Sequence, residues 1–174
     1  RTLAEQFLAQ MLAQTPRSAL RLGSLLVLVP RHPERFDKVF ALCRREGFSC
    51  VRRSSGDPCR EEHQVFLGDT MGELSMFLAA ADAAFVGGSL IKHGGQNVLE
   101  PAALGKPVVF GPHMYNFAII SELLLAHDAA QMVSDAGGLA GVIVRWLTDA
   151  SERWGRTDAW WWSRTRVPWN GCLS

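Results

Sequence analysis

The residues best suited to hold an anionic ligand lie in one segment, Phe85–Pro101, which reads FVGGSLIKHGGQNVLEP. It contains four glycines in two pairs and one hydroxyl, Ser89, and it leads into a predicted helix that begins at Asn97. Glycines let a backbone approach an anion closely, and the N–H groups at a helix start attract negative charge. Glu100, in the first turn, suits the hydroxyls of a sugar or ribose rather than a phosphate. The segment therefore indicates a nucleotide or sugar site.

This segment matches neither of two common nucleotide-binding patterns. It is not the G-x-G-x-x-G fingerprint of NAD and FAD domains, and the sequence contains no GK[ST] of a Walker A loop. The alternative interpretation is that the glycines only form turns and that Glu100 only complements the helix dipole.

Three further loops carry polar or flexible residues directly after predicted strands. Arg31 can bind a phosphate or carboxylate through two N–H groups, or it can pair with a surface carboxylate instead. In Gly68–Leu74, GDTMGEL, Met71 could lie against a planar base that hydrogen-bonds to the loop backbone, or it could pack in the core below a capped helix. His113 could contact a ligand or transfer a proton, or be held in a turn by backbone hydrogen bonds.

The elements that must position these loops alternate between short apolar strands and amphipathic helices. We predict strands over residues 24–29, 48–52, 64–67, 83–86, 107–110 and 130–133. We predict helices over residues 3–12, 34–46, 71–81, 97–104, 117–127 and 139–147, with Thr70 as an N-cap, Gly47 and Gly105 as C-caps, and Gly137–Gly138 before the last helix. The pattern is typical of a doubly wound, Rossmann-like α/β domain with a parallel sheet covered on both faces. Ligands of such sheets bind at the carboxyl ends of the strands, where all four loops lie.

Bulk composition excludes several classes of protein. With 174 residues, of which 48% are hydrophobic, and a net charge of +1, the chain is long enough for one globular domain and carries no field that would attract nucleic acid. We find no apolar run long enough to span a bilayer and no signal peptide. Four cysteines, Cys43, Cys50, Cys59 and Cys172, form no CxxC and no zinc-ligand spacing, so we expect reduced thiols and neither a metal nor a cofactor.

Five blocks, in this order, resemble the C-terminal domain of bacterial 3-deoxy-D-manno-octulosonic acid (Kdo) transferases. They are VPRHPERF (29–36), LGDTMGEL (67–74), FVGGSL (85–90), GGQNVLEPAAL (94–104) and FGPHMYNF (110–117), and the similarity covers residues 24–147. The resemblance implies a GT-B glycosyltransferase, in which two Rossmann-like domains enclose the active site. In that family the C-terminal domain binds the donor CMP-Kdo without a metal. The N-terminal domain carries a membrane anchor, the acceptor surface and a catalytic Glu.

The resemblance also implies site residues. The expected CMP contacts are Pro30, Arg31, Met71, Gly72, Glu73, Asn97, Val98, Leu99 and Glu100, with Gly88, Ser89 and His113 as additional donor contacts. Val98 departs from the pattern, because the family usually has Pro there, at a first-turn position that favours but does not require it.

The resemblance makes residues 1–150 the CMP-Kdo binding domain of an enzyme that adds Kdo to a lipid A precursor at the cytoplasmic face of the bacterial inner membrane. The acceptor domain, with its membrane anchor and catalytic base, is not within the 174 residues. We therefore expect this chain by itself to be soluble and inactive, with no catalytic residue of its own.

Two alternative functions stay open from the sequence. The chain could be a stand-alone nucleotide-binding module without chemistry. A transfer assay with an added acceptor domain would distinguish this alternative, because only half of an enzyme would then become active. It could also belong to another GT-B enzyme, such as a UDP-sugar transferase. That class shares the fold but not the block GGQNVLEPAALGKPVVFGPH, and comparing CMP with UDP binding discriminates it.

Residues 151–174 do not continue the pattern. The end, Trp160–Ser174, has no helical period and holds four of the six tryptophans, which suggests a Trp cluster packed on the domain, a membrane-surface anchor, or a frameshift. Trp has the single codon TGG, and a one-base shift of these codons allows VVEQN-x-GALERL, which has helical periodicity. We favour a frame slip near residues 155–159, with a native C-terminal amphipathic helix.

Overall fold

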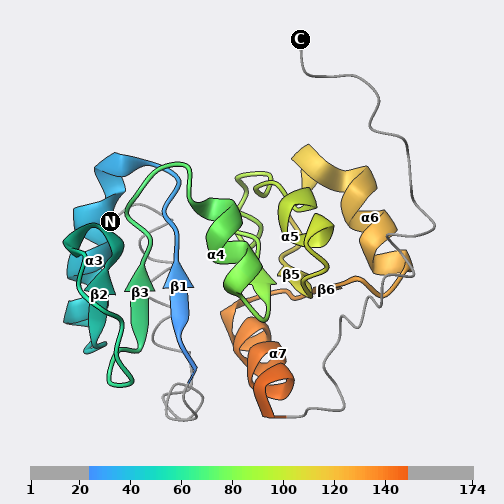
Figure 1. Ribbon diagram of the computed structural model, residues 1–174. Helices are drawn as coiled ribbons and strands as arrows, with labels where there is room; N and C mark the ends of the chain where they lie inside the picture. Colours follow the sequence, from blue (N-terminus) through green and yellow to red (C-terminus); the bar gives the residue numbers. More distant parts are fainter. Residues whose placement is uncertain (1–23, 149–174) are drawn as a thin grey trace.

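The computed structural model describes residues 24–148 (Figure 1). Its strands are β1 (Leu26–Leu28), β2 (Cys50–Arg52), β3 (Val65–Leu67), β4 (Ala84–Phe85), β5 (Val108–Phe110) and β6 (Ala130–Met132). Its helices are α3 (Phe36–Arg45), α4 (Leu74–Ala80), α5 (Leu99–Ala103), α6 (Ala118–Ala126) and α7 (Ala136–Thr148). Short 3-10 turns are η1 (Pro33–Arg35), η2 (Arg53–Ser55) and η3 (Tyr115–Phe117).

The first sheet is parallel and has the strand order β1-β3-β2. Side chains alternate between its faces, because successive residues of a strand point in opposite directions. Val65 packs with Leu42 and Cys43 of α3, whereas the ring of the next residue, Phe66, meets Phe77 of α4 edge-on at 5.8 Å. Helices α3 and α4 therefore cover opposite faces of this sheet.

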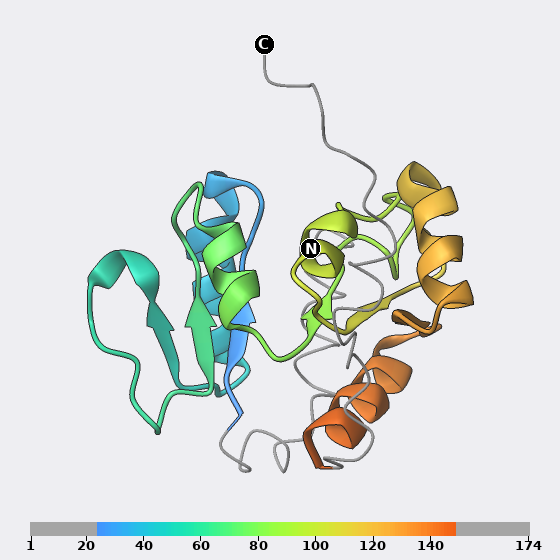
Figure 2. The ribbon, with the colours of Figure 1, turned by 45° about the vertical axis from the view of Figure 1, so that its right-hand side comes forward.

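The second sheet is also parallel, in the order β4-β5-β6. Its central strand is fully buried, and its residues again alternate: Val108 and Phe110 pack with Val98 and with Leu124 of α6, while Val109 packs with α7. Helices thus cover both faces here too. The two sheets lie side by side, and β1 is on the side of the second sheet in both views (Figures 1 and 2).

These features confirm the predicted α/β fold with parallel strands and helices on both faces. All six strands lie within two residues of their predicted bounds, and Gly47 and Gly105 follow their helices with positive φ, as C-caps do. The expectation of one sheet is corrected, because the described strands hydrogen-bond as two three-stranded sheets.

Several predicted helix starts were wrong. Helix α4 begins at Leu74 rather than Met71, because Gly72 has φ +82°, and Glu73 rather than Thr70 occupies the N-cap position. Helix α5 begins at Leu99, two residues after Asn97. Helix α7 begins at Ala136 and includes Gly137–Gly138, because the Asp135 carboxylate accepts a hydrogen bond from the N–H of Gly138 at 2.8 Å.

The predicted helix over residues 3–12 and the interpretations of residues 151–174 lie outside the described residues. Within the described part, none of the helices has the length and apolar character needed to cross a bilayer. Three cysteines there, Cys43, Cys50 and Cys59, are free thiols.

Candidate functional site at the carboxyl ends of the strands

Parallel pairing brings the predicted loops together in two pairs. The loops after β1 and β3 start side by side, since the N–H of Gly68 donates to the carbonyl of Leu28 at 2.8 Å. The loops after β4 and β5 are joined by the N–H of His113, which donates to the carbonyl of Ser89 at 2.9 Å. Helices α4 and α5, which follow two of these loops, contact each other, so the two pairs of loops lead into neighbouring helices.

Ser89 ties the glycine-rich segment to the loop after β5. Its side chain is fully buried; the hydroxyl donates to the carbonyl of Val86 at 2.6 Å and accepts from the N–H of Gly111 at 2.8 Å. A Cβ on Gly111 would lie 2.5 Å from the carbonyl oxygen of Ser89, so glycine is required there for the two loops to approach. The hydroxyl proton is therefore already used within the protein, so the Ser89 side chain is not free to donate to a ligand.

Replacing Ser89 with alanine is expected to lower the free energy of unfolding by about 1–2 kcal/mol, because it leaves a buried N–H and a buried carbonyl without partners. Urea denaturation of the full chain measures this. Ser75→Ala, at an exposed position of α4, is the matched control and should change little. Equal stability of Ser89→Ala and wild type would show that the hydroxyl does not hold the two loops.

The second glycine pair of this segment also allows two loops to pack closely together. Gly94 and Gly95 have φ of +86° and +72°, and a Cβ on either would lie 2.3 Å or less from a side-chain atom of Asn116 or Met114, respectively. The N–H of Asn116 also donates to the carbonyl of Gly94. This pair therefore fastens the segment to the loop after β5. Gly88, at φ +73°, is partly exposed.

Asn97 and Glu100 form a small hydrogen-bonded unit at the start of α5. The Asn97 side-chain oxygen accepts from the N–H of Leu99 at 3.0 Å, and its amide donates to Oε1 of Glu100, also at 3.0 Å. No hydrogen bond to Glu100 Oε2 is found among residues 24–148, so this oxygen can accept from a ligand. Leu99 is 46% exposed.

Val98 lies in the core, fully buried, so only its backbone can face a ligand. Its φ of −85° is close to the range that a proline ring allows. The backbone at this position is therefore compatible with the proline that the family usually has.

Met71, Gly72 and Glu73 form the exposed tip of the loop after β3. The Met71 side chain is 65% exposed, which removes the alternative that it packs in the core. The Glu73 carboxylate binds the Arg53 guanidinium, with Nε–Oε2 at 3.2 Å and Nη2–Oε1 at 3.0 Å, and it also accepts from the Thr70 hydroxyl. These bonds from Arg53 and then Thr70 hold the pKa of Glu73 below its usual value.

Sequence reasoning missed a buried carboxylate at the base of this loop. The Asp69 side chain is fully buried and accepts from Arg52 Nε at 2.6 Å and from the N–H of Ser54 at 2.8 Å, as well as from the Ser54 hydroxyl. Burial alone would raise the pKa of Asp69, but these hydrogen bonds outweigh it and the pKa is lowered. Arg52 also pairs with Asp37 at 2.7 Å. Asp69 and Ser54 each lie two residues after the end of a predicted strand, and a position just after a strand is the signal that selected the other loops.

Arg31 and His113 offer side chains that the protein leaves available. Arg31 is exposed and has no ion pair with the described residues, and His113 is partly exposed and uses its backbone N–H rather than its ring to bond Ser89. Pro30, before Arg31, is partly buried. No hydrogen bond or ion pair joins the Arg31 side chain to the other predicted site residues within the part of the chain that the structure describes.

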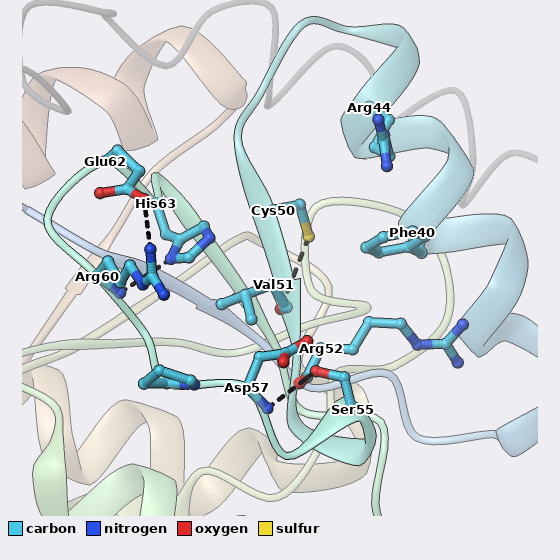
Figure 3. Close-up of a pocket in the computed structure, with 11 residues that line it drawn as sticks. Phe40, Arg44, Cys50, Val51, Arg52, Ser55, Asp57, Arg60, Glu62 and His63 are labelled. Atoms are coloured by element: carbon cyan, nitrogen blue, oxygen red, sulfur yellow. Dashed lines mark hydrogen bonds and ion pairs between the residues drawn. The ribbon is translucent and has the colours of Figure 1, made fainter.

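A separate open depression of about 380 Å³ lies at the outer edge of the first sheet, beside β2 (Figure 3). None of the predicted site residues lines it. Its polar groups mostly bind one another: the N–H of Arg60 donates to His63 Nδ1 at 2.9 Å, and the Ser55 hydroxyl donates to the carbonyl of Arg52 at 2.8 Å. With few unpaired groups converging on it, this depression is a weaker site than the strand-end loops.

Comparisons with known proteins show which family the chain resembles. No protein-family profile matches the chain. Curated 3-deoxy-D-manno-octulosonic acid transferases are 52% identical over 101 residues (Haemophilus influenzae) and 39% identical over 148 residues (Bordetella pertussis). These matches cover 58% and 84% of this chain but only 24% and 33% of the relatives, so the chain spans between a quarter and a third of their length.

One solved structure decides the family. The crystal structure of the C-terminal CMP-Kdo binding domain of WaaA from Acinetobacter baumannii is 35% identical, with a TM-score of 0.78. The match covers 88% of this chain and 79% of that domain. The chain belongs to the Kdo transferase family. Within this family it corresponds to the C-terminal domain, which confirms the GT-B half predicted from the five sequence blocks.

The strand-end loops of this Kdo transferase domain contain little that could hold a metal ion. Residues 24–148 bring no three His, Cys, Asp or Glu side chains together in a ligating group. The polar groups that these described loops present include backbone N–H groups, the Arg31 guanidinium, the His113 ring and one carboxylate oxygen of Glu100. This set suits an anionic, hydroxyl-bearing ligand.

Proposed function

We propose that this chain is the donor-binding domain of a Kdo transferase and that it binds CMP-Kdo at the carboxyl ends of its strands. One observation carries the proposal: the chain shares its fold and a third of its residues with a domain that is itself named as CMP-Kdo binding. The physical character of the loops supports the same ligand, since they combine a cation, backbone donors and a carboxylate.

Each proposed contact has a distinct chemical role. Arg31, beside Pro30, binds the CMP phosphate through its planar guanidinium. The exposed tip Met71–Glu73 offers a thioether surface and backbone groups to the cytosine. Asn97–Glu100 receives the ribose or sugar hydroxyls, with Glu100 Oε2 as acceptor. Gly88 and His113 are additional donor contacts.

For the whole enzyme we propose transfer of Kdo from CMP-Kdo to a lipid A precursor, in lipopolysaccharide biosynthesis at the cytoplasmic face of the inner membrane. The resemblance of the five sequence blocks to Kdo transferases supports this assignment. In that arrangement the acceptor surface, the membrane anchor and the base that activates the acceptor hydroxyl belong to the N-terminal domain of the family.

The test is calorimetric titration of the full chain with CMP, UMP and UDP. We expect weak binding that prefers CMP, and we expect Glu100→Ala to weaken it by about 1–3 kcal/mol, the usual cost of losing a hydrogen bond to a charged group. Glu122→Ala, at an exposed position of α6, is the control. Preference for UDP over CMP would point to another GT-B transferase, and unchanged CMP affinity in Glu100→Ala would remove that residue from the site.

A further inference from the structure

The tip of the loop after β3 is not held by packing. Nothing lies within 4 Å of the position that a Cβ on Gly72 would occupy, and Met71 is 65% exposed. The base of the same loop is fixed, because a Cβ on Gly68 would meet the Phe77 ring at 2.8 Å and Asp69 is buried. A loop that must present its tip to a ligand therefore needs another constraint there.

The bidentate pair between Arg53 and Glu73 supplies that constraint. The guanidinium contacts both carboxylate oxygens, and Thr70 adds a hydrogen bond to Oε2 from within the loop. A fork of two parallel N–H···O bonds fixes orientation as well as distance. With both oxygens occupied, Glu73 acts by shaping the loop, and the ligand receives the backbone and the Met71 side chain.

Arg53 is itself placed by the buried carboxylate. It stands between Arg52 and Ser54, and both of these neighbours bind Asp69. The register of the sheet sets Arg52 opposite Leu67, so η2 lies beside the start of the loop. A continuous series of contacts thus runs from the buried Asp69 through η2 and Arg53 to Glu73 and the tip.

We propose that Arg53 is a positioning residue for donor binding, which holds the Met71–Gly72 backbone in its ligand-competent shape through the two-point ion pair with Glu73. This inference rests on the proposed function, since it concerns the same site. Because the pair is partly exposed, with side chains 43% and 28% accessible, it contributes little to overall stability. Its effect is on the population of one loop conformation.

The experiment compares Arg53→Met, Arg53→Lys and wild type in the full chain. We expect Arg53→Met to bind CMP about tenfold more weakly, as happens when the competent conformation falls to about a tenth of its population. Arg53→Lys, which keeps the charge but not the fork, should lie between the two. Arg45→Met, which removes an exposed pair with Glu46 (3.7 Å) at the end of α3, is the matched control.

Backbone ¹⁵N relaxation of Met71 and Gly72 supplies the second measurement. We expect their order parameters to fall from the rigid range, about 0.85, to below about 0.6 in Arg53→Met, while the urea midpoint stays near that of wild type. Unchanged CMP affinity would overturn the proposal. Weaker binding with unchanged order parameters would also overturn it, because Arg53 would then contact the ligand directly. If wild type fails to bind CMP, the proposed function fails, and Arg53 is then judged by the order parameters alone.

Discussion

Replacing Asp69 with alanine is expected to lower the free energy of unfolding by about 3 kcal/mol near neutral pH. This is the low end of the cost of removing one partner from a buried ion pair, because Arg52 keeps its contact with Asp37. The N–H and hydroxyl of Ser54 lose their acceptor as well. Urea denaturation of the full chain measures the change.

The difference between wild type and Asp69→Ala should depend on pH. Since the pKa of Asp69 is lower in the folded protein than in the unfolded chain, where it is about 3.9, its stabilisation is complete above that value. It is lost as the pH falls through the folded pKa. We therefore expect the two stabilities to converge in acid, below about pH 4.

Asp82→Ala is the control for this prediction, because Asp82 is exposed in the turn between α4 and β4. It should leave stability and its pH dependence close to those of wild type. Asp69→Asn keeps an acceptor for Ser54 but not the charge, so its stability should lie between those of Asp69→Ala and wild type. A loss in Asp69→Ala no greater than that in Asp82→Ala would show that the buried carboxylate is not what anchors η2.

The largest expected effect on ligand binding is at Arg31. Arg31→Ala should weaken CMP binding about a hundredfold, since it removes two hydrogen bonds between charged groups, together worth about 3 kcal/mol. Arg31→Lys should also bind more weakly than wild type, because a lysine keeps the charge but cannot form the planar fork. Added salt should reduce the difference, because Arg31 is exposed.

Arg35→Ala provides the matched control, since Arg35 is an exposed arginine four residues further along the chain, in η1. It should bind CMP nearly as well as wild type. If Arg31→Lys also matches wild type, the bidentate phosphate contact is wrong and Arg31 acts only as a point charge or has no role. Calorimetric titration at two salt concentrations separates these outcomes.

Local pattern was enough to predict the elements and the edge at which a ligand would bind. Apolar runs such as Val108–Phe110 and the glycines that follow helices are short-range signals, and the rule that ligands bind at strand ends then selects loops directly. The same reasoning failed at Gly72 and Gly137. A glycine can bend the chain out of a helix or be included in one, and neighbouring residues such as Asp135 decide which occurs.

The hydrogen bonds and ion pairs of the loop side chains could be identified only from the tertiary structure. From the sequence, Ser89 could equally bind a ligand or a backbone group, and only the approach of Gly111 shows that its hydroxyl is already used. Pairing of Arg53 with Glu73 requires β2 to lie next to β3, in the register that sets Arg52 beside Leu67. Strand order is a long-range property, since it depends on how the whole set of strands and helices packs. The sequence by itself therefore determined the fold class and the family resemblance, and it predicted the edge at which a ligand would bind. The tertiary structure decided which side chains at that edge already have partners within the protein.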